Sequence, residues 1–261
     1  MEWADEFRGK KVVITGAAGL YGGRFATAFA ARGAVLCLAD LRRPLLDGVV
    51  RRLGLDARAT LLHGTDLTCV DSIRDLAALV GEAWGAPDIV INNAGIYPRT
   101  GPLIDLDERE WDRMFAINVR APFIVTREMA KLMVARGVQG AVVNIGSGKS
   151  RQVAAGLIPY CTTKAALERL SKGFALELAQ HRIRVNVVDP PFAAGSDSSP
   201  MPDDYIVHMM ARIPLGASGP DDAANAVLYL CSRAANYITG AVLTVDGGNS
   251  IGAWQPPGSA N

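Results

Sequence analysis

Short apolar runs alternate with longer amphipathic segments along this chain. The apolar runs are rich in Val, Ile and Leu and contain few polar positions, which is typical of parallel strands buried on both faces. Seven such runs occupy residues 11–16, 34–40, 59–66, 88–95, 140–147, 183–189 and 240–248. Segments with helical periodicity separate most of them, at residues 23–33, 71–84, 107–137, 164–180 and 221–235. With right-handed crossovers, this alternation predicts an α/β fold: a doubly wound parallel sheet of about seven strands with helices on both faces.

Two segments depart from this alternation. Residues 190–219 are rich in Pro, Ser, Gly and Met, and we expect them to form a mobile excursion or a lid over a substrate site. The tail, residues 251–261, is expected to be frayed. No linker, internal repeat or low-complexity block divides the chain, so we expect residues 1–261 to form a single domain.

The composition narrows the range of partners. The chain has 49% apolar and 20% charged residues, and its 27 basic and 26 acidic residues leave a net charge of +1. This balance gives no broad field for a polyanion, so we expect neither nucleic acid nor a membrane as a partner. No apolar run reaches the roughly 18 residues of a membrane span, the first residues lack the apolar stretch of a signal peptide, and the four cysteines lack metal-ligand spacing. These features predict a soluble cytoplasmic protein without a metal site.

The sequence TGAAGLYGG, residues 15–23, joins the first apolar run to the first helical segment. A glycine-rich turn at this position places backbone amides at a helix N-terminus, where a pyrophosphate is favoured. Asp40 ends the second apolar run, 24 residues after Gly16, and its carboxylate suits the hydroxyl groups of an adenosine ribose. The pattern indicates a dinucleotide site, although a plain strand-to-helix turn would show the same glycines.

Tyr160 and Lys164 lie four residues apart in the string YCTTK, so on a helix they project from the same face. A phenol has an ordinary pKa of about 10. A fixed ammonium nearby lowers that pKa by roughly 1–3 units, which makes the phenol a competent acid or base for an alcohol or a ketone. The alternative is an exposed helical pair without a catalytic role.

Several motifs occur in the order typical of one family. Besides the glycine loop and the Tyr160–Lys164 pair, these are Asp66–Leu67, NNAG at 92–95, Asn118 in FAINVRAPF, Ser147 thirteen residues before Tyr160, and VDGG at 245–248. In these motifs, which extend over nearly the whole chain, the sequence resembles the short, single-domain branch of the short-chain dehydrogenases/reductases. The resemblance implies a Rossmann-like fold and an NAD(P)-dependent oxidoreductase of CH–OH groups.

The resemblance also implies the roles of four residues. Tyr160 would exchange a proton with the substrate oxygen while a hydride passes between the substrate carbon and the B face of the nicotinamide. Lys164 would bind the nicotinamide ribose and lower the pKa of the phenol. Ser147 would orient and polarise the substrate oxygen, and Asn118, in a helix irregularity, would hold a water that leads to the lysine.

The resemblance places the dinucleotide along the carboxyl edge of the sheet. Its implied contacts, besides Tyr160 and Lys164, are Gly16, Gly19, Leu20, Tyr21, Gly22, Asp40, Leu41, Asp66, Leu67, Asn93, Ala94, Gly95, Pro190 and Phe192. A carboxylate at Asp40 repels a 2′-phosphate, which favours NAD over NADP, whereas Arg42 and Arg43 would suit that phosphate.

The chain departs from the family pattern at several positions. Leu20 stands where the short branch has its middle glycine, and we expect Gly19 to make the close approach instead, with Leu20 turned away from the phosphates. Gly146 replaces the first residue of a two-serine string. After the sixth apolar run, Pro191 replaces a glycine and stiffens the turn, and Gly195 replaces a threonine.

Candidate substrate residues follow two of the apolar runs or belong to the segment over 190–219. They are Ile96, Tyr97, Arg99, Lys149, Arg151 and His208. The basic side chains at positions 99, 149 and 151 favour an anionic or polyhydroxylated substrate, unless they are solvated charges at the rim of the site.

The leading interpretation is an NAD-dependent dehydrogenase or reductase of a secondary alcohol or ketone. Two alternatives remain: a 3-oxoacyl reductase-like enzyme that uses NADPH and an acyl-carrier partner, and a nucleotide-binding regulator without catalysis. An extended-branch epimerase or dehydratase is suggested only by the glycine spacing. The resemblance further implies a homotetramer or a homodimer, with the helix over 160–180 and the final strand at the subunit contacts.

Overall fold

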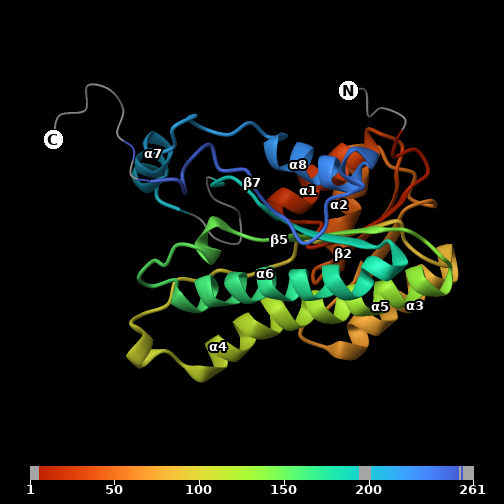
Figure 1. Cartoon of the computed structure of the whole chain (residues 1–261), viewed down its shortest axis with the longest axis horizontal. Helices are drawn as coiled ribbons and strands as arrows, with labels where there is room; N and C mark the ends of the chain where they lie inside the picture. The colour runs from red at the N-terminus through yellow and green to blue at the C-terminus, as the bar shows by residue number, and fades with distance from the viewer. Residues whose placement is uncertain (1–5, 194–200, 253, 255–261) are drawn as a thin grey trace.

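The computed structural model describes residues 6–193, 201–252 and 254. In this part of the chain, seven strands form one parallel sheet in the order β3-β2-β1-β4-β5-β6-β7 (Figure 1). The strands are β1 (Lys11–Thr15), β2 (Val35–Asp40), β3 (Leu61–Gly64), β4 (Ile89–Asn92), β5 (Ala141–Ile145), β6 (Arg184–Asp189) and β7 (Val242–Thr244). Each strand lies within one of the seven apolar runs, so the predicted parallel sheet is confirmed.

The strand order reverses between β1 and β4. The chain leaves β1, adds β2 and β3 on one side, and returns to β4 on the other side of β1. In doubly wound sheets a crevice forms at this switch, outside the carboxyl ends of the strands. The segments that follow β1 and β4 therefore flank the place where a ligand is expected.

Helices cover both faces of the sheet. Figure 1 shows α1, α2 and α8 on one face and α3, α5 and α6 on the other. The helices are α1 (Leu20–Ala30), α2 (Arg43–Leu53), α3 (Val70–Trp84), α4 (Glu108–Phe115), α5 (Ala121–Ala135), α6 (Ile158–Leu178), α7 (Asp203–Ala211) and α8 (Asp222–Cys231). None of the helices in the described ranges combines the length and the apolar character needed to cross a bilayer.

Two apolar cores hold the layers together, one on each face of the sheet. In β1, the buried side chains of Val12 and Ile14 join the core with α1, α2 and α8, whereas Val13 joins the core with α3 and α5. Neighbouring residues of a strand point to opposite faces. A central strand between two cores must therefore be apolar throughout, which explains the unbroken runs in the sequence.

The sequence did not predict α2. Its arginines and Pro44 obscure an apolar stripe that includes the buried residues Leu46 and Val49. The proline lies in the first turn, where its missing amide costs no helical hydrogen bond. Gly54, with a φ of +61°, ends the helix in the left-handed conformation that glycine tolerates best.

Two other segments differ in detail from the sequence-based predictions. The helical segment over 107–137 is divided by a π-helical turn, η2 (Ala116–Arg120), between α4 and α5. The segment over 190–219 contains α7, while its residues 194–200, and with them Gly195, lie outside the described part of the chain. Of the tail, only residues 251, 252 and 254 are described.

Candidate active site

The glycine loop makes a tight turn between β1 and α1. Gly16 has a φ of +63°, and a Cβ there would lie 2.8 Å from the Cα atom of Ala94. A Cβ on Gly22 would overlap the carbonyl oxygen of Gly16 and lie 2.8 Å from the Cα atom of Ala17. Backbone atoms cannot move aside as a flexible side chain can, so both positions require glycine.

The N-terminus of α1 offers uncapped amides. Gly19 occupies the N-cap position, and no side chain hydrogen-bonds to the first turn. The first amides of such a helix have no partner within the helix, and their partial positive charge suits an anion. Leu20, the first helical residue, is 37% exposed. The turn therefore fits a pyrophosphate without a glycine at position 20.

Asp40 joins the end of β2 to the glycine loop. Its Oδ2 accepts a hydrogen bond from the amide of Ala18 (3.1 Å), and its Oδ1 accepts one from the amide of Arg42 (3.1 Å). The guanidinium of Arg42 lies 4.0 Å from the carboxylate, and Arg43 is paired with Asp47 at 2.9 Å. The negative charge of Asp40 thus stays at the mouth of the loop, while the charge of Arg43 is compensated elsewhere.

The motif at 92–95 fastens the end of β4 to the same loop. Asn93 donates through Nδ2 to the carbonyl oxygens of Thr15 (2.9 Å) and Gly16 (3.0 Å). The Thr15 hydroxyl accepts hydrogen bonds from the amides of Asn93 (3.1 Å) and Ala94 (3.2 Å). These bonds fix the two sides of the crevice relative to each other.

Asp66, which follows β3, accepts hydrogen bonds from the amide and hydroxyl of Thr68, and these lower the pKa of its carboxyl.

Tyr160, Lys164 and Ser147 meet where α6 passes the end of β5. Tyr160 and Lys164 occupy successive turns near the start of α6, and the Lys164 Nζ lies 5.6 Å from the centre of the Tyr160 ring. The buried lysine donates to the carbonyl oxygen of Ile145, the last residue of β5, at 2.7 Å. Two residues further on, the Ser147 side chain hydrogen-bonds to Tyr160. The end of β5 therefore orients Lys164 and Ser147, the two side chains that lie next to the Tyr160 phenol.

Burial dominates the electrostatics of this group. It raises the pKa of Tyr160 to about 12, although the hydrogen bond with Ser147 acts in the opposite direction. Burial also lowers the pKa of Lys164 to about 8, and the nearby carboxylate of Asp189 offsets part of that shift. The spacing of Tyr160 and Lys164 predicted a lowered pKa for the phenol, whereas the structure raises that pKa. The reason is that the loss of solvation on burial outweighs the favourable contacts that the protein provides.

Asn118 lies in the π-helical turn η2, which is the kind of helix irregularity that the resemblance implied. Its Oδ1 accepts a hydrogen bond from the amide of Ile96 (2.9 Å), and its Nδ2 donates to the carbonyl oxygen of Ile96 (2.8 Å) and to Thr163 (3.1 Å). A Cβ on Gly95 would lie 3.3 Å from the Asn118 Oδ1 and 3.7 Å from the Lys164 Nζ. Asn118 thus ties the segment after β4 to α6, close to the lysine.

One aromatic ring lies beside the phenol, and a second aromatic pair lies near Arg99. The rings of Tyr97 and Tyr160 lie 5.8 Å apart, and the guanidinium of Arg99 lies over the ring of Tyr205 at 5.2 Å. The centre of the Phe192 ring lies 6.4 Å from the centre of the same Tyr205 ring. The sequence did not indicate Tyr205, which comes from α7; its signal was one of two aromatic residues in the segment over 190–219, which is rich in Met and Pro.

Other predicted residues have partners within the protein. Lys149 donates its amide to the Ser147 hydroxyl (3.2 Å), and the exposed His208 lies 3.4 Å from Arg212 on α7. The Tyr21 hydroxyl donates to the carbonyl oxygen of Pro191 at 2.6 Å, which links α1 to the segment after β6.

Arg151 lies between charged and polar groups. It is 2.8 Å from Asp189, 2.8 Å from the Thr244 hydroxyl and 3.4 Å from Glu168. The sequence analysis did not single out Asp189. The available signal was one carboxylate at the end of the run over 183–189.

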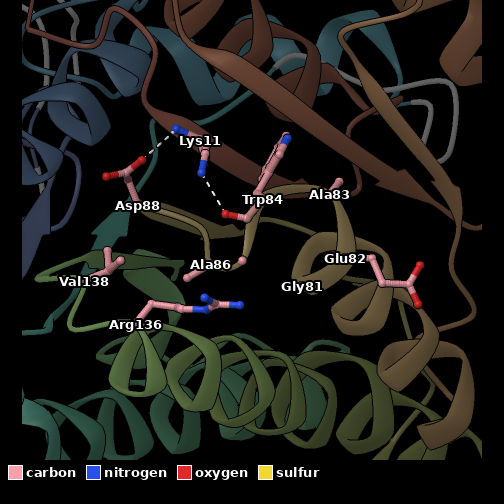
Figure 2. A pocket seen from close by; sticks show the side chains of 10 residues that line it. Lys11, Gly81, Glu82, Ala83, Trp84, Ala86, Asp88, Arg136 and Val138 are labelled. Atoms are coloured by element: carbon pink, nitrogen blue, oxygen red, sulfur yellow. Dashed lines mark hydrogen bonds between the residues drawn. The ribbon is translucent and has the colours of Figure 1, made fainter.

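A cavity of about 500 Å³ opens at the opposite, amino edge of the sheet (Figure 2). Lys11, which begins β1, donates through Nζ to the carbonyl oxygen of Trp84 (2.8 Å) and through its amide to Asp88 (2.9 Å). No residue predicted to bind cofactor or substrate lines this cavity. It is therefore separate from the crevice at the carboxyl ends of the strands.

Comparisons with known proteins extend these observations. A family model described as enoyl-(acyl carrier protein) reductase matches residues 16–250. The 2,5-dichloro-2,5-cyclohexadiene-1,4-diol dehydrogenase of Sphingobium indicum is 34% identical over 95% of this chain and 99% of its own. A solved short-chain type dehydrogenase/reductase from Mycobacterium marinum is 31% identical, with a TM-score of 0.87 over 95% of this chain and 98% of its own. The 3-ketoacyl-(acyl-carrier-protein) reductase from Brucella melitensis, solved with NADH, is 30% identical, with a TM-score of 0.83 over 94% of this chain and 99% of its own.

These likenesses extend over almost the whole sequence. One of the similar proteins is named as a diol dehydrogenase, and another was solved with a nicotinamide dinucleotide. The chain therefore belongs to the short-chain dehydrogenases/reductases, and it is an oxidoreductase that acts on CH–OH groups with a nicotinamide cofactor.

Proposed function

We propose that the enzyme interconverts a secondary alcohol and its ketone with NAD(H), and that Tyr160 exchanges the proton. The observation that supports this proposal is the meeting of three groups at the end of β5. The phenol of Tyr160 hydrogen-bonds to Ser147, and the buried Lys164 is anchored on Ile145 beside it. This arrangement places a proton donor or acceptor and an orienting hydroxyl at one point of the crevice.

Tyr160 holds the proton that the reaction moves. The raised pKa keeps the phenol protonated near neutrality, which suits proton donation to a ketone oxygen. In the oxidative direction the phenolate accepts the proton of the alcohol, and alkaline pH favours that form. A nicotinamide dinucleotide held by the glycine loop and Lys164 would supply or accept the hydride.

Ser147 and Lys164 assist the phenol in different ways. The Ser147 hydroxyl, oriented by the Lys149 amide, donates to the substrate oxygen and holds it next to Tyr160. Lys164 uses one of its three ammonium hydrogens on Ile145 and keeps the others for ribose hydroxyl groups. With a pKa of about 8 it is largely charged at neutral pH, and its charge favours the phenolate. Asn118 fixes the segment beside Lys164, where it would hold a water that leads to this lysine.

We infer that NAD is preferred over NADP. The carboxylate of Asp40 stands at the end of β2 with both oxygens directed to backbone amides, so it is held in place. A fixed negative charge accepts hydrogen bonds from ribose hydroxyls and repels a phosphate.

Asp40→Asn is expected to shift the ratio of kcat/KM values for NADP and NAD roughly tenfold toward NADP. Two like charges about 4 Å apart near a surface repel by about 1–4 kcal/mol, and the amide removes that repulsion while it retains a hydrogen-bond acceptor. Initial rates with both cofactors measure the ratio. Asp71→Asn, at an exposed carboxylate on α3, is the matched control. An unchanged ratio in Asp40→Asn would contradict the inference.

We infer a substrate with an apolar or cyclic body. Tyr97 lies beside Tyr160, Phe192 and Tyr205 add aromatic surface, and we assign α7 to a lid over the site. Arg99 lies against Tyr205, so it adds a positive charge at the rim. These features suit a ring-shaped alcohol or ketone, a class that includes the diol for which the Sphingobium indicum protein is named.

The likeness to a solved 3-ketoacyl reductase supports a second candidate, reduction of a 3-oxoacyl thioester. A panel of cyclic and open-chain secondary alcohols, their ketones and a 3-oxoacyl thioester separates the two. Each compound is tested with NAD(H) and NADP(H) at several pH values, with nicotinamide absorbance as the readout. Turnover of cyclic compounds with NAD(H) supports the first candidate, and preferential turnover of the thioester with NADPH supports the second.

We infer that the protein is a homodimer or homotetramer that uses α6 at a subunit contact. Leu176 on α6 is 80% exposed, and Phe123 on α5 is 37% exposed and packs on Phe174 at 5.9 Å. Exposed apolar side chains gathered on neighbouring helices are typical of a protein interface. Leu176→Arg is therefore expected to lower the molecular mass measured by light scattering at micromolar concentration. A wild-type protein that is monomeric at every concentration would contradict this inference.

A further inference from the structure

A carboxylate is completely buried beside the candidate active site. Asp189, the last residue of β6, has a side chain with 0% exposure. A buried carboxylate is costly unless a charged or hydrogen-bonding partner compensates it. The assigned roles of Tyr160, Lys164, Ser147 and Asn118 make no use of Asp189.

Arg151 is the charged partner of this carboxylate. Its Nη2 lies 2.8 Å from the Asp189 Oδ2 and donates to the Thr244 hydroxyl at 2.8 Å, and its Nη1 lies 3.4 Å from Glu168. Glu168 also accepts a hydrogen bond from the Ser150 hydroxyl. The set therefore connects the loop after Ser147 to β6, β7 and α6.

Gly146 provides the space that Asp189 occupies. A Cβ on Gly146 would overlap the Asp189 Oδ1 and lie 2.6 Å from the Val187 Cγ1. The loss of the first serine from the family's two-serine string thus has a physical reason. The residue next to Ser147 must be glycine while Asp189 and Val187 occupy this space. Gly146, Asp189 and Arg151 therefore form one structural unit next to Ser147.

The charge of Asp189 acts on both titrating groups of the site. The carboxylate raises the pKa of Lys164 and also raises that of Tyr160. Burial raises the pKa of Asp189 itself, while Arg151 beside it favours the ionised form. The other groups that face this cluster are Glu168 toward Asp189, Asp246 toward Arg151, and Tyr97 and Cys161 toward Tyr160.

We propose that Asp189 is a positioning residue: ionised and paired with Arg151, it holds the loop of Ser147 in place and sets the pH range in which Tyr160 and Lys164 work. This proposal rests on the proposed roles of Tyr160 and Lys164. A buried negative charge favours the ammonium and disfavours the phenolate. Removing it therefore shifts the titration of both groups in the same direction, toward lower pH. A purely structural role for Asp189 would change stability or rate without moving the titrations together.

The first test is the pH profile of kcat/KM for alcohol oxidation by Asp189→Asn and by the wild-type enzyme. We expect both limbs of the profile to move to lower pH, by roughly half a unit to one unit. Arg151 has a side chain 41% exposed, so it can reach water when its partner is neutral, and the variant should fold. Asp88→Asn removes the same charge at the amino edge of the sheet, where Asp88 pairs with Lys10, and should leave both limbs in place. An active Asp189→Asn enzyme with the wild-type profile, or an equal shift in Asp88→Asn, would overturn the proposal.

The second test examines the steric link and does not need turnover. Gly146→Ser alone is expected to lower the Tm strongly, and Gly146→Ser combined with Asp189→Ala is expected to lower it less than the sum of the two single changes. Additive effects would show that Gly146 and Asp189 are not one unit, and would also overturn the proposal.

Failure of this proposal can be distinguished from failure of the proposed function. A wild-type enzyme that turns over no alcohol or ketone contradicts the proposed function. Wild-type turnover with an unmoved Asp189→Asn profile contradicts only the role of Asp189.

Discussion

Tyr160→Phe is expected to lower kcat by about 10²–10⁴-fold in both directions, because it removes the group that exchanges the proton. The ring is retained and still packs against Tyr97, so the crevice keeps its shape. Binding of NADH, followed by its fluorescence, should stay within about twofold of the wild-type affinity, which is a free-energy change of less than about 0.5 kcal/mol. The variant thus separates chemistry from cofactor binding.

Tyr237→Phe is the matched control for this prediction. It removes the same hydroxyl from a fully exposed ring and should retain the wild-type kcat. A Tyr160→Phe enzyme with more than a tenth of wild-type activity would remove the phenol from the mechanism. Loss of NADH binding in the same variant would assign Tyr160 to the cofactor site alone.

Gly22→Ala is expected to abolish binding of the dinucleotide and to lower the Tm. The added methyl group would overlap the carbonyl oxygen of Gly16 and lie 2.8 Å from the Cα atom of Ala17, so the turn between β1 and α1 must open. Opening the turn displaces the amides at the start of α1 and disturbs the bond from Asn93 to Gly16. Isothermal titration with NADH and thermal unfolding measure the two effects.

Gly48→Ala provides a control with the same chemical change inside a helix. A Cβ at Gly48 meets nothing within 4 Å, and alanine is favoured over glycine in a helix interior by roughly 0.5–1 kcal/mol. This variant should bind NADH normally and unfold at an equal or slightly higher temperature. If Gly22→Ala behaved in the same way, the loop would not be the tight turn that the structure describes.

The sequence predicted the features of the fold that depend on local pattern. The strands were found because residues such as Val12, Val13 and Ile14 are all apolar, as a strand between two cores requires. The helix α2 was missed because its surface arginines mask a narrow stripe around Leu46 and Val49. Local pattern failed at a helix that buries only three of its residues.

The residues of the site were predicted by resemblance and by spacing, while their environment was not. Tyr160 and Lys164 could be paired from their separation of four residues, but burial, which raises the pKa of the phenol, is a tertiary property. Asp189 and Gly146 are 43 residues apart, and only strand pairing between β5 and β6 brings them together. No local window of sequence contains such a relation.

The hydrogen bonds that build the crevice span long stretches of chain. Asn93 reaches back 77 residues to Gly16, and Arg151 reaches forward 93 residues to Thr244. Such contacts form late during folding, because distant parts of the chain must first be brought together. A refolding chain should therefore regain its helical circular dichroism before it regains turnover. Catalytic activity is consequently a sensitive reporter of whether the complete sheet has assembled.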